Sequence, residues 1–253
     1  MNGLQGGGSG SVTYDPSTGL WYNRGVLITP TFSVAALADL YALDPATYNG
    51  SVLNCTGVGL GGSLWKASSA LDRWVLAGPC FLADYYLDAD NVALASDKSV
   101  EQLMRALTIP VATDWNAASR SLFQAGDILR IFEEFQYAGA GAATTYTIRH
   151  RMFTAAGTSG NNIRGGSVVI ANVSFPAKYE LRRRAATTVR MQGIDSADPF
   201  PGNSSTALSA DVTVANLDAA TMYLNLTGNL NANDAGQNIT LKTYTVELIT
   251  PGH

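Results

Sequence analysis

The stretch from Gln124 to Phe153 constrains the fold of this chain more than any other part of the sequence. It opens with a turn signal, Ala125-Gly126-Asp127, and continues as two runs in which apolar and polar residues alternate. The apolar sides of the two runs are formed by Leu129, Ile131, Phe135 and Tyr137 and by Tyr146, Ile148, His150 and Met152. Because successive side chains of a strand point to opposite faces, each run predicts a strand with one buried face. The glycine/alanine loop at 138–141 predicts that the two strands pair as a hairpin.

The second half of the chain, from about residue 111, has the pattern of a β-sandwich. After the opening pair, six further segments are rich in strand-forming residues, and turn-forming clusters separate most of them. They are centred on SVVIANVSF, KYELRRR, TTVRMQG, LSADVTVAN, TMYLNLTG and ITLKTYTVELI. Eight short strands without a helical crossover predict antiparallel pairing, and an eight-stranded jelly-roll-like sandwich closes such a set. An immunoglobulin-like sandwich is disfavoured because no Cys-Trp-Cys framework occurs.

The first half predicts a smaller β module and a connection to the sandwich, so the fold class is mainly β. We expect an N-terminal anchor or adaptor segment at 1–25, a small antiparallel β module with a short helix at 26–82, and a linker at 83–110. The β-sandwich then occupies 111–253. Within the module, a hairpin carries Trp65 and Trp74, which we expect in its core.

Two short helices are expected in this first half. The first covers 31–40, with Ser33 as its N-cap and apolar residues at helical spacing. The second lies in the linker, where Ser99 and Gln102 have the spacing of a capping box. It should end before Pro110, because the residue before a proline disfavours the helical conformation.

Composition excludes several classes of partner. The 253 residues are 46% apolar and only 14% charged, and the formal net charge of −4 predicts no general affinity for nucleic acid. No apolar run is long enough to span a bilayer, so no membrane insertion is expected. The N-terminus lacks the basic and apolar segments of a secretory signal. Two cysteines are too few to staple a chain of this size.

The residues that carry chemistry are sparse, and we expect no enzyme, no cofactor and no metal site. His150 lies on the apolar side of its strand and is interpreted as a buried structural histidine. No Gly-x-Ser-x-Gly motif or metal-spaced cluster occurs. Glu133 and Glu134 are adjacent, so on a strand they point to opposite faces and cannot flank one bond. Carboxylates from distant segments could still converge.

The basic concentration of the chain is Arg182-Arg183-Arg184 with Arg190. One interpretation is that these side chains are solvated strand edges that discourage aggregation. The other is that they form ion pairs between subunits or contact an anionic glycan.

Two parts of the sequence carry a resemblance to a known family. Residues 31–78, TFSVAALADLYALDPATYNGSVLNCTGVGLGGSLWKASSALDRWVLAG, combine a short helix, a glycine turn, a strand and a tryptophan-bearing hairpin. The C-terminal half opens with SLFQAGDILRI and ends with TLKTYTVELI. Together they resemble bacteriophage virion fibre and appendage proteins of the tail-fibre, baseplate or head-fibre type, which carry a β-sandwich at the fibre end.

The resemblance implies a viral structural protein that forms a homotrimer. Its N-terminal segment would dock on other virion proteins of the tail, baseplate or capsid, and its C-terminal domain would bind a receptor during host attachment. A host-surface glycan is a further expected partner. The resemblance implies a place in the virion, after assembly in the host cytoplasm. No long shaft is present in the sequence, so a short appendage is expected.

The residues expected to make these contacts fall in two groups. Receptor contact is assigned to the loops at 157–166 and 196–205, through Asn161, Asn162, Arg164, Asn203 and Ser204. Their glycine, asparagine and serine content suits adaptable hydrogen bonding. Docking on the particle is assigned to Leu4, Tyr14, Trp21 and Tyr22.

Alternative functions from other classes stay open at this point. One is a head decoration or connector protein without receptor binding. Another is a carbohydrate-binding module in which surface aromatics such as Trp21, Trp65, Trp74 and Trp115 stack on sugars. The third is a glycan-cleaving enzyme.

Overall fold

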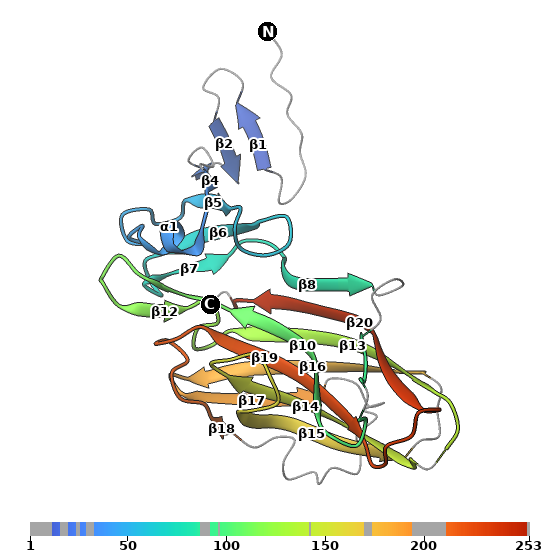
Figure 1. The fold of residues 1–253 in the computed structure, drawn as a ribbon. Helices are drawn as coiled ribbons and strands as arrows, with labels where there is room; N and C mark the ends of the chain where they lie inside the picture. Colours follow the sequence, from blue (N-terminus) through green and yellow to red (C-terminus); the bar gives the residue numbers. More distant parts are fainter. Residues whose placement is uncertain are drawn as a thin grey trace. The chain divides into compact units, whose positions relative to one another are not determined.

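The computed structural model describes residues 12–15, 20–23, 26–28, 33–86, 92–95, 97–141, 143–169, 174–193 and 211–251. Their regular structure is one short helix and strands in five sheets (Figure 1), which confirms the mainly β fold. The chain divides into two compact units. The first comprises 1–80 with 113–117, and the second comprises 81–112 with 118–253. No helix in the described ranges has the length and apolar character needed to cross a membrane.

Three short strands come first in the chain. They are β1 (Val12–Asp15), β2 (Leu20–Asn23) and β3 (Val26–Ile28), and they pair antiparallel in that order. Tyr14 lies in β1 opposite Trp21 of β2, and Tyr22 follows Trp21. Leu4 lies outside the described residues, as does the turn at 16–19.

The module that follows is a four-stranded sheet with one helix. Its strands, in sheet order, are β4 (Ser33–Val34), β5 (Val52–Cys55), β6 (Ser63–Ser68) and β7 (Arg73–Leu76). The expected antiparallel pairing holds for β5, β6 and β7, whereas β4 runs parallel to β5.

The predicted first helix is shorter than expected. Helix α1 spans Leu37–Tyr41 with Ala36 at its N-cap, where the Asp39 carboxylate accepts a hydrogen bond from the Ala36 amide at 3.0 Å. Ser33 is not a cap, because it lies in β4 and pairs with Asn54. Val34, which has helical spacing to Leu37, also lies in β4 and pairs with Cys55. Strand pairing with β5 therefore overrides this helical spacing.

The core of the module contains both tryptophans of the hairpin, as predicted. Trp65 is opposite Leu76, and Ala67 is opposite Trp74, so the two indoles share one face of the sheet. Their relative exposures are only 1% and 2%. The Trp74 indole donates to the Leu43 carbonyl at 2.9 Å, which satisfies its polar group inside the module.

The second unit is built from two larger sheets. One has the order β10-β19-β14-β15 and the other has the order β18-β17-β16-β13-β20-β8, with β9 also pairing β20. The first contains Gln102–Ile109, Met222–Leu230, Thr145–Phe153 and Asn161–Val169. The second contains Val212–Thr213, Thr188–Gly193, Ser174–Ala185, Ile128–Ala138, Asn238–Ile249, Cys80–Tyr86 and Val92–Ala93. A small sheet pairs β11 (Val111–Thr113) with β12 (Ser119–Ser121). The two large sheets pack as a jelly-roll-like sandwich, in agreement with the prediction (Figure 1).

The predicted hairpin between residues 124 and 153 is wrong. β13 pairs with β16 and β20, and β14 pairs with β15 and β19, so the two strands belong to different sheets. Alternation predicted each strand correctly, because each has one buried face, but alternation does not identify the hydrogen-bonding partner. The loop at 138–141 needs a glycine at 139 because the backbone there passes close to Gly236. A Cβ on Gly139 would lie 1.8 Å from the carbonyl oxygen of Gly236.

The helix predicted from Ser99 is also wrong. Residues 102–109 form strand β10, and the 83–110 segment supplies strands to both large sheets. The register of β10 against β19 shifts between Leu103 and Arg105. This irregularity places Met104 and Leu107 on the buried side at a spacing of three. A β-bulge therefore imitates the apolar periodicity of a helix.

The loop predicted at 157–166 is correct only in its first part. β15 begins at Asn161 and continues to Val169, and β16 begins at Ser174. The predicted strand SVVIANVSF thus straddles two strands, and residues 170–173 between them lie outside the described residues. The loop predicted at 196–205 lies entirely outside them.

Candidate functional site

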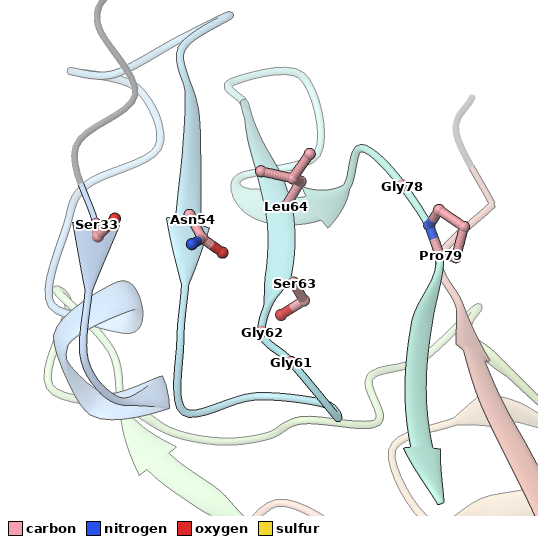
Figure 2. Close-up of a pocket in the computed structure, with 8 residues that line it drawn as sticks. All are labelled: Ser33, Asn54, Gly61, Gly62, Ser63, Leu64, Gly78 and Pro79. Atoms are coloured by element: carbon pink, nitrogen blue, oxygen red, sulfur yellow. The ribbon is translucent and has the colours of Figure 1, made fainter. Parts of the chain in front are cut away.

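A pocket of about 430 Å³ lies in the N-terminal module (Figure 2). One cross-strand row of the sheet contributes Ser33, Asn54 and Leu64, which are register partners on β4, β5 and β6. The lining is completed by Gly61 and Gly62 in the turn before β6, by Ser63 at the start of β6, and by Gly78 and Pro79 after β7. Figure 2 shows the Asn54 side chain between the strands that carry Ser33 and Leu64.

Glycines shape the floor of this pocket. Gly61 and Gly62 have φ angles of +81° and +88°, a left-handed conformation that favours glycine. A Cβ at Gly62 would lie 3.1 Å from the Asn54 amide oxygen and 3.2 Å from the Cys55 carbonyl oxygen, so a side chain there would crowd Asn54. The glycine turn therefore keeps open the space into which Asn54 projects.

The pocket lining is uncharged. Within the described part of the chain, no hydrogen bond engages the Ser33 hydroxyl or the Asn54 amide. The Ser63 hydroxyl accepts the indole N–H of Trp65 at 2.7 Å and so couples the pocket edge to the core. Leu64 is 44% exposed and, with Pro79, gives the pocket an apolar side. The arrangement can bind a neutral ligand, but it offers no acid, base or nucleophile of catalytic strength.

A second polar cluster lies inside the sandwich. Glu133 of β13 and His150 of β14 come from different sheets, and Nε2 of His150 lies 2.6 Å from Oε1 of Glu133. Their relative exposures are 0% and 1%. The prediction that His150 is buried is confirmed, and its hydrogen bond with Glu133 joins the two sheets across the core.

Two further side chains complete this core cluster. The His150 and Tyr179 rings meet edge to face with centroids 5.1 Å apart, and the Arg164 guanidinium lies 4.5 Å from the centre of the Tyr179 ring. Arg164 is only 4% exposed and lies opposite His150 in the register of β14 and β15. The cluster therefore links side chains of β13, β14, β15 and β16, strands that belong to both large sheets, which favours a role in holding the sheets together.

A third cluster lies on the outer face of the β10-β19-β14-β15 sheet. The Glu101 carboxylate accepts two hydrogen bonds from Arg151, at 2.7 and 2.9 Å, and one from Arg149 at 3.2 Å. The Thr227 hydroxyl also donates to it. Burial raises the pKa of Glu101, but the hydrogen bonds from Arg151 and Thr227 and the two guanidinium charges outweigh burial and lower the pKa. This network ties the segment before β10 to the sheet.

The arginines singled out in the sequence form ion pairs within the chain. Arg182 pairs with Glu180, and Arg190 and Arg184 both reach Asp211. Arg183 is 2% exposed and donates to both Asp218 oxygens and to the Phe123 carbonyl. Burial raises the pKa of Asp218. The hydrogen bonds from Arg183 and from the Ser121 amide lower the pKa by more than burial raises it, so the net shift is downward.

The structure separates the predicted receptor-contact residues. Asn161 and Asn162 are exposed at the start of β15, and the Asn161 amide donates to the Thr213 carbonyl at 2.7 Å. Arg164 was expected at the surface but is buried, because the register of β15 against β14 shifts at Ile163 and places Arg164 opposite the buried His150, next to the Tyr179 ring. Asn203 and Ser204 lie outside the described residues. Of the docking residues, Tyr14, Trp21 and Tyr22 lie in strands whose side chains are not described.

Sequence reasoning missed two of these features. Glu133 occupies the alternation position between Ile131 and Phe135, so the apolar pattern itself signalled a buried carboxylate. The pocket was missed because the Gly57-to-Gly62 segment was interpreted only as a turn; the paired glycines before Leu64 were the available signal. No group of three His, Cys, Asp or Glu side chains in the described ranges is placed to hold a metal ion.

Comparisons with known proteins give no family. No family model and no curated protein matches the sequence. Among solved structures, an endo-1,3-β-glucanase from Streptomyces sioyaensis aligns over 58% of this chain and 76% of its own, with 12% identity and a TM-score of 0.29. Infectious bursal disease virus, Gx strain, aligns over 79% of this chain and 40% of its own, with 13% identity and a TM-score of 0.29. The metal-free lectin I-B4 from Griffonia simplicifolia aligns over 68% and 99%, with 7% identity and a TM-score of 0.28. Likeness at this level carries no argument about function.

Proposed function

We propose that this chain is a structural protein of a bacteriophage virion. It forms a short trimeric fibre or appendage that is attached to the particle by its N-terminal segment and contacts the host surface through its C-terminal sandwich. The observation that carries the proposal is that ionisable side chains of the sandwich form hydrogen bonds with one another. Glu133 and His150 are sealed between the sheets, and Glu101 is surrounded by donors from its own chain. Hydrogen bonds of this kind join strands and loops within one chain and so make the sandwich more rigid, which suits an exposed component of a particle.

The resemblance of residues 31–78 and of the C-terminal half to fibre and appendage proteins supports the same function. The division into a small module and a larger sandwich is compatible with separate docking and contact roles. The carbohydrate-binding alternative based on stacking tryptophans is weakened, since Trp65 and Trp74 are buried, although Trp115 is 40% exposed.

For the host contact we propose the surface around the β14–β15 connection. Residues 154–160 are largely exposed, and Asn161 and Asn162 follow them directly. Arg164 is withdrawn from the contact because its guanidinium lies in the core. The contribution of Asn203 and Ser204 remains a prediction.

The location on the particle is tested by imaging intact virions that carry a small protein tag on the C-terminus of this chain. We expect density for the tag at the outer end of an appendage with threefold symmetry. Absence of the tagged chain from purified virions contradicts the proposal.

The host contact is tested separately with particles in which Asn161 and Asn162 are replaced by alanine and residues 155–159 by a shorter turn. We expect reduced adsorption to host cells at unchanged particle yield. Lys178→Ala, on the exposed face of the other sheet, is the matched control. Unchanged adsorption would favour a head decoration or connector protein without receptor binding.

A further inference from the structure

We propose that the pocket of the N-terminal module binds a neutral saccharide unit. This site lies in a different unit from the surface proposed for host contact, and it does not depend on the phage assignment.

The lining of the pocket determines which charge a ligand can carry. None of the eight lining residues is ionisable at neutral pH, and a volume of about 430 Å³ lies within the range of small-ligand sites. A phosphate, carboxylate or ammonium group would lose hydration on entry and find no counter-charge in the lining. The ligand is therefore uncharged.

The polar side chains of the pocket can both donate and accept hydrogen bonds. The Asn54 amide offers both a donor and an acceptor, and the Ser33 hydroxyl, on the adjacent strand, can do either. Sugar hydroxyls also donate and accept, and neighbouring hydroxyls on a ring match the two ends of one amide. Leu64 and Pro79 supply an apolar side for the C–H face of the ring.

The pocket does not suit a peptide that binds as an added strand. Peptides that extend a sheet bind at an edge, where backbone N–H and C=O groups are free. The pocket instead opens on the face of the sheet, where Asn54 and Leu64 are paired in the β5–β6 register. Short side chains therefore make the polar contacts here, and they suit a compact ring with many hydroxyls better than an extended backbone.

The test is saturation-transfer difference NMR on the full-length protein. The probes are the methyl glycosides of glucose, galactose, mannose and N-acetylglucosamine, with methyl glucuronide as the charged counterpart. We expect at least one neutral glycoside to bind with a dissociation constant of about 1 mM and the glucuronide to bind more weakly. Asn54→Ala should weaken binding about tenfold, because it removes both hydrogen-bonding ends of the amide.

Lys66→Ala is the matched control, since Lys66 lies on the same face of β6 as Leu64 but outside the lining. It should bind the glycosides as the wild type does. A synthetic peptide of residues 1–11, which has no ionisable side chain and is blocked at both ends, is the competing probe. The proposal is overturned if no glycoside gives a signal, if Asn54→Ala binds as well as the wild type, or if only the peptide binds. A change in sedimentation on Asn54→Ala, without glycoside binding, identifies a subunit interface and also overturns it.

Discussion

At the scale of single residues, Trp74 combines packing with a satisfied polar group. Its side chain is 2% exposed, and its indole N–H donates to the Leu43 carbonyl at 2.9 Å. Trp74→Ala leaves a cavity and an unpaired carbonyl, so we expect the free energy of unfolding to fall by about 3–5 kcal/mol. Urea denaturation followed by circular dichroism measures the change. Leu60→Ala, at a side chain that is 53% exposed in the same unit, is the control and should change stability by less than about 0.5 kcal/mol.

Glu133 and His150 allow a second prediction at this scale. Removing one partner of a buried pair leaves the other without its hydrogen bond, so Glu133→Met should lower the free energy of unfolding by about 3–5 kcal/mol. The double variant Glu133→Met/His150→Leu should lose clearly less than the sum of the two single changes, because no polar partner is then left behind. A double-mutant cycle in urea measures this coupling. Additive losses would show that the 2.6 Å contact contributes no coupling energy.

Residue-scale features differ in how well the sequence predicts them. The burial of Glu133 follows from alternation alone, since residues 129, 131, 133, 135 and 137 share one face of β13. The burial of Arg164 does not, because its neighbours Asn162 and Gly165 are typical of a loop. It becomes explicable only when the Tyr179 ring of another strand is known to lie 4.5 Å away.

At the scale of elements, alternation predicted the strands of the sandwich, whereas partners and irregularities escaped it. β13 and β14 have clear two-residue periodicity, yet β13 pairs with the sequence-distant β16 and β20, and β14 pairs with the next strand, β15, and with the distant β19. Strands that are neighbours in sequence often pair as a hairpin, but they do not have to. Here β13 and β14 lie in facing sheets, and Glu133 contacts His150 across the core between them. In β10, the bulge near Met104 produced helical spacing in a strand. Short-range patterns describe the face of an element and leave its pairing undetermined.

The Glu101 network gives an element-scale prediction about pH. Its pKa is lowered in the folded protein relative to the unfolded chain. The carboxylate therefore contributes stability above the unfolded-state pKa of about 4.3, and this contribution is lost as pH falls through the folded-state pKa. We expect the stability of the wild type to fall more between about pH 5 and pH 3 than that of Glu101→Gln, which cannot change charge. Thermal unfolding across this range measures the difference, and equal slopes for the two proteins would contradict it.

At the scale of the whole molecule, the prediction is a homotrimer. Val100, Leu103 and Phe153 in the second unit are 57%, 39% and 41% exposed. Leu103 lies opposite Thr227 and Phe153 lies opposite Tyr223 on the face of the β10-β19-β14-β15 sheet that points away from the core. Symmetric neighbours would cover such side chains, and burying each one contributes about 1.5–3 kcal/mol.

Sedimentation velocity of the purified chain should therefore give a trimer at micromolar concentration. The double variant Leu103→Glu/Phe153→Glu places charges in the expected interface, so it should sediment as a folded monomer with unchanged circular dichroism. Lys178→Glu alters charge on the exposed face of the other large sheet and should leave the trimer intact. A wild-type monomer, or a trimer that survives the double variant, would rule out this face as the subunit contact. A wild-type monomer would also contradict the threefold symmetry of the proposed appendage. Each chain would then bind the particle by its own contacts, without the gain in affinity that linked copies provide.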